Sequence, residues 1–75
     1  MREIRVFHDW SMHFRHEGVQ YAFFHNRTGF KVLKKIYYDG RNMYVPVVKA
    51  RKKLETINKY MNVLGVNFVL GDVNG

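Results

Sequence analysis

The sequence has no cysteine and a single proline, Pro46, among its 75 residues. Without cysteine, the chain has neither a disulfide framework nor a cysteine zinc site. It also lacks an apolar run long enough to cross a bilayer, and Arg2, Glu3 and Arg5 interrupt the N-terminus where a signal peptide would be apolar. We therefore expect a cytoplasmic protein that does not insert into a membrane.

Acidic residues are scarce in the middle of the chain. Residues 27–53 contain nine Lys or Arg and one carboxylate, Asp39, which gives a net charge of +8. The remaining residues carry four basic and five acidic side chains, a net charge of −1, so the formal charge of +7 is a local property. A local positive field favours an acidic partner: nucleic acid first, then an acidic protein surface or an anionic membrane. The alternative is a charged face that serves only solubility.

Apolar residues are plentiful, at 47% of the sequence, and include six Phe, five Tyr and one Trp. This composition argues against disorder and supplies one compact core. A chain of this length buries only about 60 to 65% of the surface that its unfolded form exposes. We predict a single domain over residues 1–75 with modest stability.

Three turns that contain glycine divide the first 48 residues into four predicted strands. Apolar and polar residues alternate between the turns with a period of two, which is typical of strands. If each turn is a tight hairpin, the numbers of paired residues sum to 35 around Gly18, to 55 before Gly29 and to 79 at Gly40, where Asp39-Gly40 is a type I′ candidate. The strands are expected at about 3–16, 19–26, 30–38 and 41–48.

These registers place apolar side chains on one face of the sheet. The misfit on that face is Lys34, whose stem is expected to lie over the core, and Pro46 suits a fourth strand at the sheet edge. A one-residue slip at Gly29 would turn Lys31 and Lys35 to the apolar face. Two cross-sheet rows on this face are Met12, Phe23, Val32 and Val47, and His16, Val19, Ile36 and Met43.

From residue 49 the apolar period becomes helical. A helix at about 49–64 should cover the apolar sheet face, and Gly65 stands where a left-handed C-terminal cap is expected. A short strand at 66–70 could pair beside the first strand, and residues 71–75 form a predicted tail. The predicted fold class is α+β: a four-stranded antiparallel β-meander packed on one C-terminal α-helix, with a possible short fifth strand. The helical stripe consists of Ala50, Leu54, Ile57, Met61 and Leu64.

The opposite face of the predicted sheet collects basic and aromatic side chains. Lysine and arginine neutralise phosphates, glutamine can read base edges, and tyrosine can stack on bases. The alternative is that Phe24, Leu33 and Pro46 are the ordinary apolar share of an exposed sheet. The predicted rows are Arg15, Gln20, Lys35 and Tyr44; His13, Ala22, Leu33 and Pro46; and Ser11, Phe24, Lys31 and Val48, with Tyr37 and Asn42 towards the last turn.

The predicted helix start breaks local rules. Lys49, Arg51, Lys52 and Lys53 crowd a first turn where the helix dipole prefers anions, and no capping side chain precedes them. We hypothesise that this turn holds a phosphate, the alternative being a solvated lysine cluster.

An enzyme is not expected. His8, His16 and His25 lie in the mostly apolar register and His13 points to the opposite face, so a shared metal site is not predicted. His13 as the general base of a metal-independent ribonuclease is the catalytic alternative. The carboxylates are too scattered for a paired acid–base site, and we predict no cofactor.

One family resembles this chain in the order of its elements. The matching stretches are Gly18-Val19-Gln20-Tyr21, the basic hairpin from Arg27 to Lys35, the turn Asp39-Gly40-Arg41, the amphipathic helix, and Val66-Asn67-Phe68. This order resembles DNA-binding domains of the plant ethylene-response-factor type and the related integrase arm-binding domains, three-stranded sheets backed by one helix. In that family the sheet face away from the helix enters the major groove, which by resemblance assigns contacts to Gln20, Lys31, Lys35 and Tyr44. The chain departs from the pattern in its long extra N-terminal strand, a third strand without the usual Leu-Gly-aromatic ending, and a helix without the alanine-rich run.

The sequence thus predicts a small basic protein that binds nucleic acid, with DNA favoured over RNA, and would suit a phage or mobile-element regulator. The alternative is a protein-binding module or inhibitor that docks on an acidic partner, and a homodimer through an exposed strand edge is open. The predicted nucleic-acid-binding residues are Arg15, Gln20, Arg27, Lys31, Lys35, Tyr37, Arg41, Tyr44, Lys49, Arg51, Lys52 and Lys53.

Overall fold

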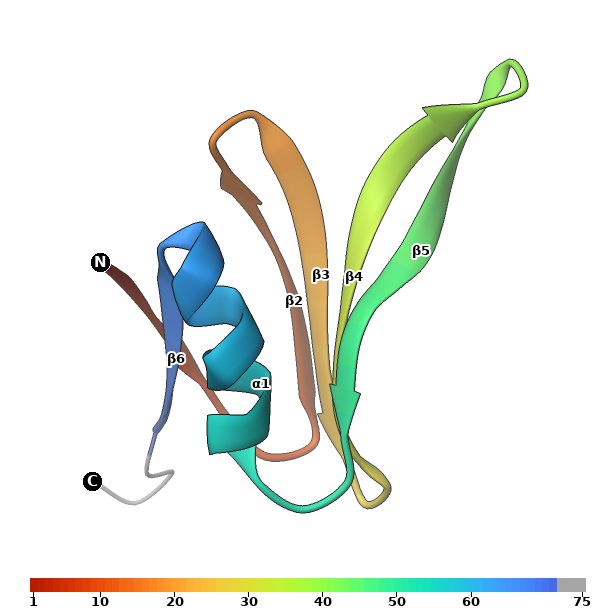
Figure 1. The fold of residues 1–75 in the computed structure, drawn as a ribbon. Coiled ribbons are helices and arrows are strands. Elements are labelled where there is room, and N and C mark those ends of the chain that lie inside the picture. The colour runs from red at the N-terminus through yellow and green to blue at the C-terminus, as the bar shows by residue number, and fades with distance from the viewer. Residues whose placement is uncertain (72–75) are drawn as a thin grey trace.

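Four strands form an antiparallel meander in the computed structural model, which describes residues 1–71 (Figure 1). They are β2 (Trp10–His16), β3 (Val19–Asn26), β4 (Gly29–Tyr38) and β5 (Arg41–Ala50), and they lie in that order across the sheet. The helix α1 (Leu54–Met61) and the short 3-10 helix η1 (Asn62–Leu64) follow the meander. The predicted α+β class is confirmed, and Pro46 lies on an edge strand as expected.

The first predicted strand is two strands. β1 (Arg2–Val6) ends before a turn in which Asp9 adopts a φ of 49°, and β2 begins at Trp10. β1 pairs in parallel with β6 (Val66–Leu70) to form a second, two-stranded sheet. The strand at 66–70 therefore does lie beside the first strand, but the prediction of one continuous strand over 3–16 is wrong. Side chains alternate with a period of two both before and after this turn, so the sequence pattern did not reveal the turn.

The predicted registers hold over most of the meander. Pairs sum to 35 between β2 and β3 and to 55 between β3 and β4, so no slip occurs at Gly29. Between β4 and β5 the sum is 79 as far as Leu33↔Pro46 and then shifts by one at a β-bulge. Because Val47 is the extra residue, Val32 pairs with Val48 and not with Val47, and Lys31 pairs with Lys49 and not with Val48. Both valines pack against the core.

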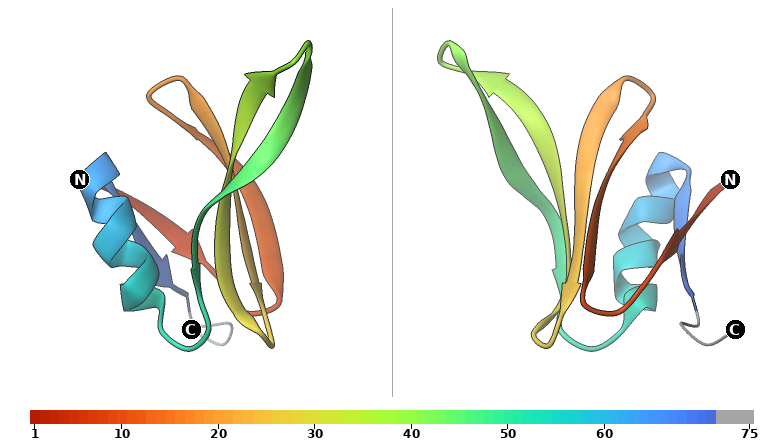
Figure 2. Two further views of the ribbon diagram at one scale, coloured as in Figure 1. Left: turned by 45° about the vertical axis from the view of Figure 1, so that its right-hand side comes forward. Right: turned by 180° about the vertical axis from the view of Figure 1, so that it is seen from behind.

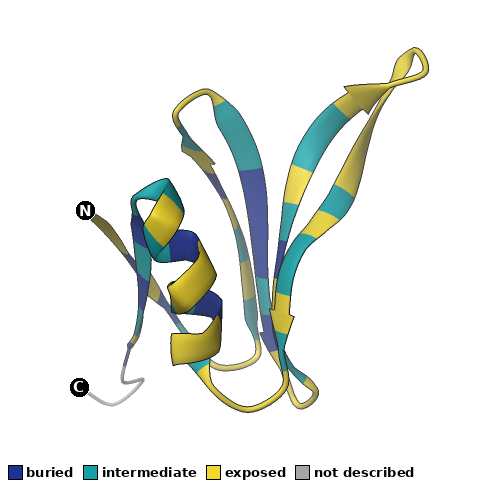
Figure 3. Cartoon of the chain, viewed as in Figure 1, coloured by how far each residue is buried: buried dark blue, intermediate teal, exposed yellow. Residues whose placement is uncertain are grey.

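The β3–β4 ladder is shorter than predicted. It ends at Tyr21↔Lys34, so Gln20 does not pair with Lys35 and Val19 does not pair with Ile36. Beyond this point the two hairpins diverge towards their turns, as Figure 1 and both views of Figure 2 show. Little apolar surface joins the two hairpins there. Lys34, the last residue of β4 that pairs with β3, is exposed, and the far end of the β4–β5 hairpin lies outside the core (Figure 3).

The helix begins at Leu54, five residues later than predicted, with Lys53 as an N-cap that makes no side-chain capping bond. Lys49 and Ala50 instead extend β5, because β4 offers them ladder partners in Lys31 and Phe30. The prediction that Lys49, Arg51, Lys52 and Lys53 form the first turn of the helix is therefore wrong, since Lys49 belongs to β5 and Lys53 is the N-cap. Gly65 does provide the left-handed cap, with a φ of 90°, at the end of η1.

The core lies between the meander and a layer formed by α1, β1 and β6 (Figure 2, left). Phe68 of β6 meets the rings of Phe23 and Phe14, with centroids 4.9 Å and 5.7 Å away. We call this side of the meander the inner face and the opposite side the open face. The buried core side chains are Ile4, Val6, Phe14, Tyr21, Phe23, Phe30, Val32, Ile57, Met61, Val66 and Phe68.

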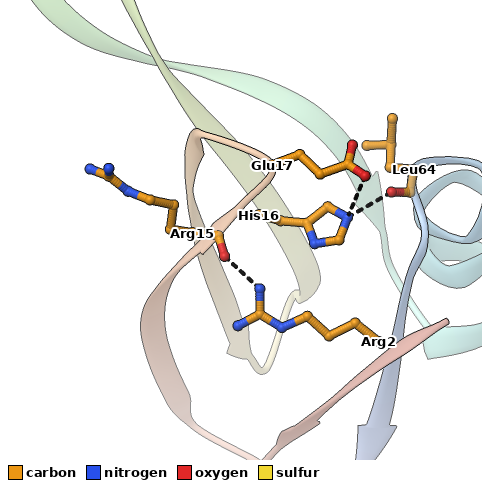
Figure 4. A network of polar contacts seen from close by, with 5 residues as sticks. All are labelled: Arg2, Arg15, His16, Glu17 and Leu64. Carbon is orange, nitrogen blue, oxygen red and sulfur yellow. Dashed lines mark hydrogen bonds and ion pairs between the residues drawn. The ribbon is translucent and has the colours of Figure 1, made fainter.

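Side-chain hydrogen bonds tie the β2–β3 hairpin to the opposite layer (Figure 4). His16 Nε2 donates to the Leu64 carbonyl oxygen at 2.9 Å, and Arg2 donates to the carbonyl oxygen of Arg15. Gly71, at the start of the predicted tail, donates its main-chain N–H to Val6, while residues 72–75 of that tail lie outside the described residues. The far end of the β4–β5 hairpin, residues 36–43, has no comparable tie, since no side-chain hydrogen bond of these residues is found within the described chain; the nearest is that of Tyr44 to Gln20.

Asn58 provides a testable link between α1 and β6. Its Nδ2 donates to the Phe68 carbonyl oxygen at 2.8 Å, and its Oδ1 accepts from the Phe68 main-chain N–H at 2.7 Å. Replacing Asn58 with alanine leaves both main-chain groups of a buried residue without these partners. We expect the free energy of unfolding to fall by about 2 to 3 kcal/mol in urea unfolding. A loss below about 0.5 kcal/mol would contradict this role, and exposed Thr56→Ala serves as the matched helix control.

Candidate nucleic-acid interface

A chain of polar contacts occupies the centre of the open face. Gln20 Nε2 on β3 donates to the Tyr44 hydroxyl of β5 at 3.1 Å, and that hydroxyl lies 3.2 Å from His13 Nδ1 on β2. Because the Tyr44 oxygen accepts from Gln20, its hydrogen is free to bond His13. Two predicted contact residues, Gln20 and Tyr44, are thus brought together and joined to His13, which was predicted to lie on this face but not to contact nucleic acid.

Two side chains from the outer strands β2 and β5 meet over the middle of the open face. In a flat sheet β2 and β5 would lie about 14 Å apart, at about 4.8 Å per strand step. The His13 and Tyr44 rings nevertheless have centroids only 5.8 Å apart. Ala22 beneath them is 2% exposed and Leu33 and Phe24 are half-buried, whereas Pro46 on the edge strand is an exposed apolar residue, as the alternative supposed. Any ligand therefore meets a surface whose middle is already filled.

The cationic side chains of the open face gather at its two ends. At one end lies a hollow of about 530 Å³ beside the Gly29 turn, which we call the turn hollow. Lys31 and its cross-strand partner Lys49 enter the hollow, and the Lys31 ammonium lies 5.2 Å from the centroid of the Phe24 ring. Its lining residues are Phe24, Asn26, Thr28, Gly29, Phe30, Lys31, Lys49, Ala50 and Arg51, none of them acidic.

At the other end, the gap between the diverging hairpins forms a hollow of about 320 Å³, which we call the hairpin cleft. Arg15 and Lys35 bring positive charge to it, and Tyr37 lies beside its cross-strand partner Asn42. The cleft also contains no acidic side chain; its lining residues are Arg15, Gly18, Val19, Gln20, Lys35, Ile36, Tyr37 and Asn42. Asn42 was predicted on this face but not as a contact residue. The cleft exists only because β3 and β4 stop pairing beyond Tyr21 and Lys34, which the sequence pattern does not show.

Five predicted contact residues line neither hollow, and one of them, Tyr44, instead bonds to Gln20 in the centre of the open face. Arg27 occupies the β3–β4 turn near the turn hollow, and Lys52 and Lys53 are exposed in the bend before α1. Arg41 pairs with Tyr38 and so belongs to the register of the inner face. The structure brings Arg15, Gln20, Lys35, Tyr37 and Tyr44 together at one end of the open face, and Lys31, Lys49 and Arg51 at the other.

The positive charge is not neutralised within the described chain. Over residues 1–71, no Lys or Arg nitrogen lies within 4.0 Å of a carboxylate oxygen, and the ion-pair distance found joins His16 to Glu17 at 3.9 Å. Since all 13 Lys and Arg side chains are among these residues, their field is available to a partner.

No group of three or more His, Asp or Glu side chains between residues 1 and 71 is arranged to hold a metal ion. Burial raises the pKa of the Tyr21 phenol, with the charge of Glu17 and the Tyr60 phenol adding to the effect, but Tyr21 faces the core. In the described part of the chain, no helix has the length and apolar character needed to span a membrane.

Comparison with known proteins gives no relative: no protein-family model, curated protein or solved structure matches this chain. The resemblance to ethylene-response-factor-type and integrase arm-binding domains stays a prediction. The residues of the open face are therefore the basis from which function is inferred.

Proposed function

We propose that this protein binds nucleic acid, with DNA favoured over RNA, through the open face of its meander. The observation that carries the proposal is the gathering of cations in two hollows that contain no carboxylate, with no Lys or Arg ion pair among residues 1–71. Phosphates are the ligands that such sites suit best, because their binding releases counterions. The protein acts as a binding module without catalysis, in which Gln20, Tyr44 and His13 orient one another.

The two hollows have a spacing that suits a polyanion. Lys31 and Lys35 lie four residues apart on β4, which corresponds to about 13 Å along a strand. Successive phosphates of one nucleic-acid strand are spaced by about 3.4 Å along a duplex axis, so a short segment reaches both ends of the face. A compact anion would reach one end only.

DNA is favoured by the shape of the β4–β5 hairpin. Beyond Lys34, where β4 no longer pairs with β3, this hairpin is a two-stranded ribbon that stands apart from the rest of the molecule (Figure 1). The major groove of B-form DNA admits such a ribbon, whereas the major groove of A-form RNA is too narrow for side chains to read.

A salt titration tests this function. We expect the protein to bind duplex DNA with a log–log slope against salt of about −4 to −5, as for about five neutralised phosphates, and to lose a labelled DNA to an excess of unrelated DNA. RNA of the same length should bind more weakly. An absence of binding to any nucleic acid at low salt would contradict the proposal and favour the alternative, an acidic protein partner, whose binding should survive excess DNA.

A further inference from the structure

The hairpin cleft lies where the pairing of β3 with β4 stops. If the pairing continued in the same register, the two strands would close the cleft. Continuing the β3–β4 register would join Gln20 to Lys35 and Val19 to Ile36, but no ladder bond joins these pairs. Main-chain N–H and C=O groups that face each other across the gap therefore lack a partner in the opposite strand. Such groups bond to water or to a ligand.

The lining of the cleft combines three kinds of chemistry. Arg15 and Lys35 supply positive charge, and Gln20 and Asn42 supply amides with both donors and acceptors. Tyr37 is 73% exposed and presents a ring that nothing in the core covers. Val19 and Ile36 belong to the inner-face register, so the cleft has an apolar floor. Gln20 Nε2 donates a hydrogen bond to the Tyr44 hydroxyl, so Gln20 Oε1 remains to accept a hydrogen bond from a ligand.

A nucleotide has the same three parts: an anionic phosphate, a flat aromatic base, and a base edge with donors and acceptors. In a duplex the base faces are covered by their neighbours and the pairing edges are occupied, so only an unpaired base offers both. We propose that the hairpin cleft binds one unpaired nucleotide, with its phosphate between Arg15 and Lys35 and its base against Tyr37 and Asn42. This inference depends on the proposed function and extends it from duplex DNA to strands with unpaired bases.

Two neighbouring tyrosines provide a matched pair of variants. Tyr37 and Tyr38 are 73% and 67% exposed, and they lie on opposite faces of β4. For Tyr37→Leu we expect the affinity for a labelled oligothymidylate to fall about tenfold, since stacking on an aromatic side chain accounts for an effect of this order per base. The affinity for a fully paired duplex of equal length should change less than about twofold. Tyr38→Leu should leave both affinities unchanged. Fluorescence anisotropy at one fixed salt concentration measures all of them.

A second variant keeps the test decisive if Tyr37→Leu alters the hairpin. Asn42→Ala removes the amide that lies opposite Tyr37 and should weaken oligothymidylate binding about fivefold, with the duplex unaffected. The thermal midpoint of each variant checks that the fold is intact. If the wild-type protein binds nucleic acid but Tyr37→Leu and Tyr38→Leu behave alike, the cleft does not take a base, and the proposed function stands. If the wild-type protein binds no nucleic acid at all, both proposals fail.

Discussion

Replacing Gly29 with alanine is expected to lower the free energy of unfolding by about 2 to 4 kcal/mol. Gly29 has a φ of 131°, a conformation that side chains disfavour, and the end of β5 passes directly over it. A Cβ at this position would lie 2.7 Å from Arg51 Cα and closer still to the Ala50 carbonyl oxygen. Since these are main-chain atoms, β5 itself would have to move. For a domain of this size the loss is a large share of a total stability of about 4 to 11 kcal/mol.

Gly40→Ala is the control for this variant. Gly40 has a φ of 79°, but an added Cβ would meet no atom within 4 Å. It should lose about 1 to 2 kcal/mol from backbone strain alone. Urea unfolding of the two variants measures the difference. Equal losses would contradict the close approach of β5 to the Gly29 turn, and with it the position of Lys49 and Arg51 beside the turn hollow.

The second large effect concerns charge. We expect the triple variant Lys31→Gln, Lys49→Gln, Arg51→Gln to weaken DNA binding about 100-fold at 0.1 M salt and to make the log–log salt slope shallower by about 2.7. These three residues line the turn hollow, and each is expected to neutralise one phosphate.

A control with the same net charge separates this site from the general field of the protein. Arg5→Gln, Lys34→Gln, Lys59→Gln also removes three exposed cations, and none of them lines either hollow. Because only long-range attraction is lost, its affinity for DNA should fall less than about fivefold. Similar losses in the two triple variants would show that binding follows net charge and not the open face.

The turns made much of this fold predictable from the sequence. Gly18 and Gly40 adopt φ values of 81° and 79°, and the residues before them, Glu17 and Asp39, also have positive φ. Two-residue loops of this kind fix which residues pair, so the faces of the meander followed from a local signal. For the same reason Arg15, Lys31 and Lys35 were correctly placed on the open face.

The remaining features depend on contacts between distant parts of the chain. Residues 49–53 fit a helical pattern by themselves, but Phe30 and Lys31 hold Ala50 and Lys49 in β5. The bulge at Val47 and the early end of the β3–β4 ladder likewise reflect packing across the sheet. Asn42 was overlooked because its environment is created by that early end, for which no short stretch of sequence carries a signal.

The most direct test of the central claim follows side-chain amide resonances during a DNA titration by NMR. Gln20, Asn26 and Asn42 line the hollows of the open face, whereas Asn58 and Asn62 bond to β6 on the opposite side of the core. If DNA binds the open face, the side-chain amide resonances of Gln20, Asn26 and Asn42 shift as DNA is added, while those of Asn58 and Asn62 keep their positions. Shifts confined to Asn58 and Asn62, or no shift at saturating DNA, would contradict the central claim.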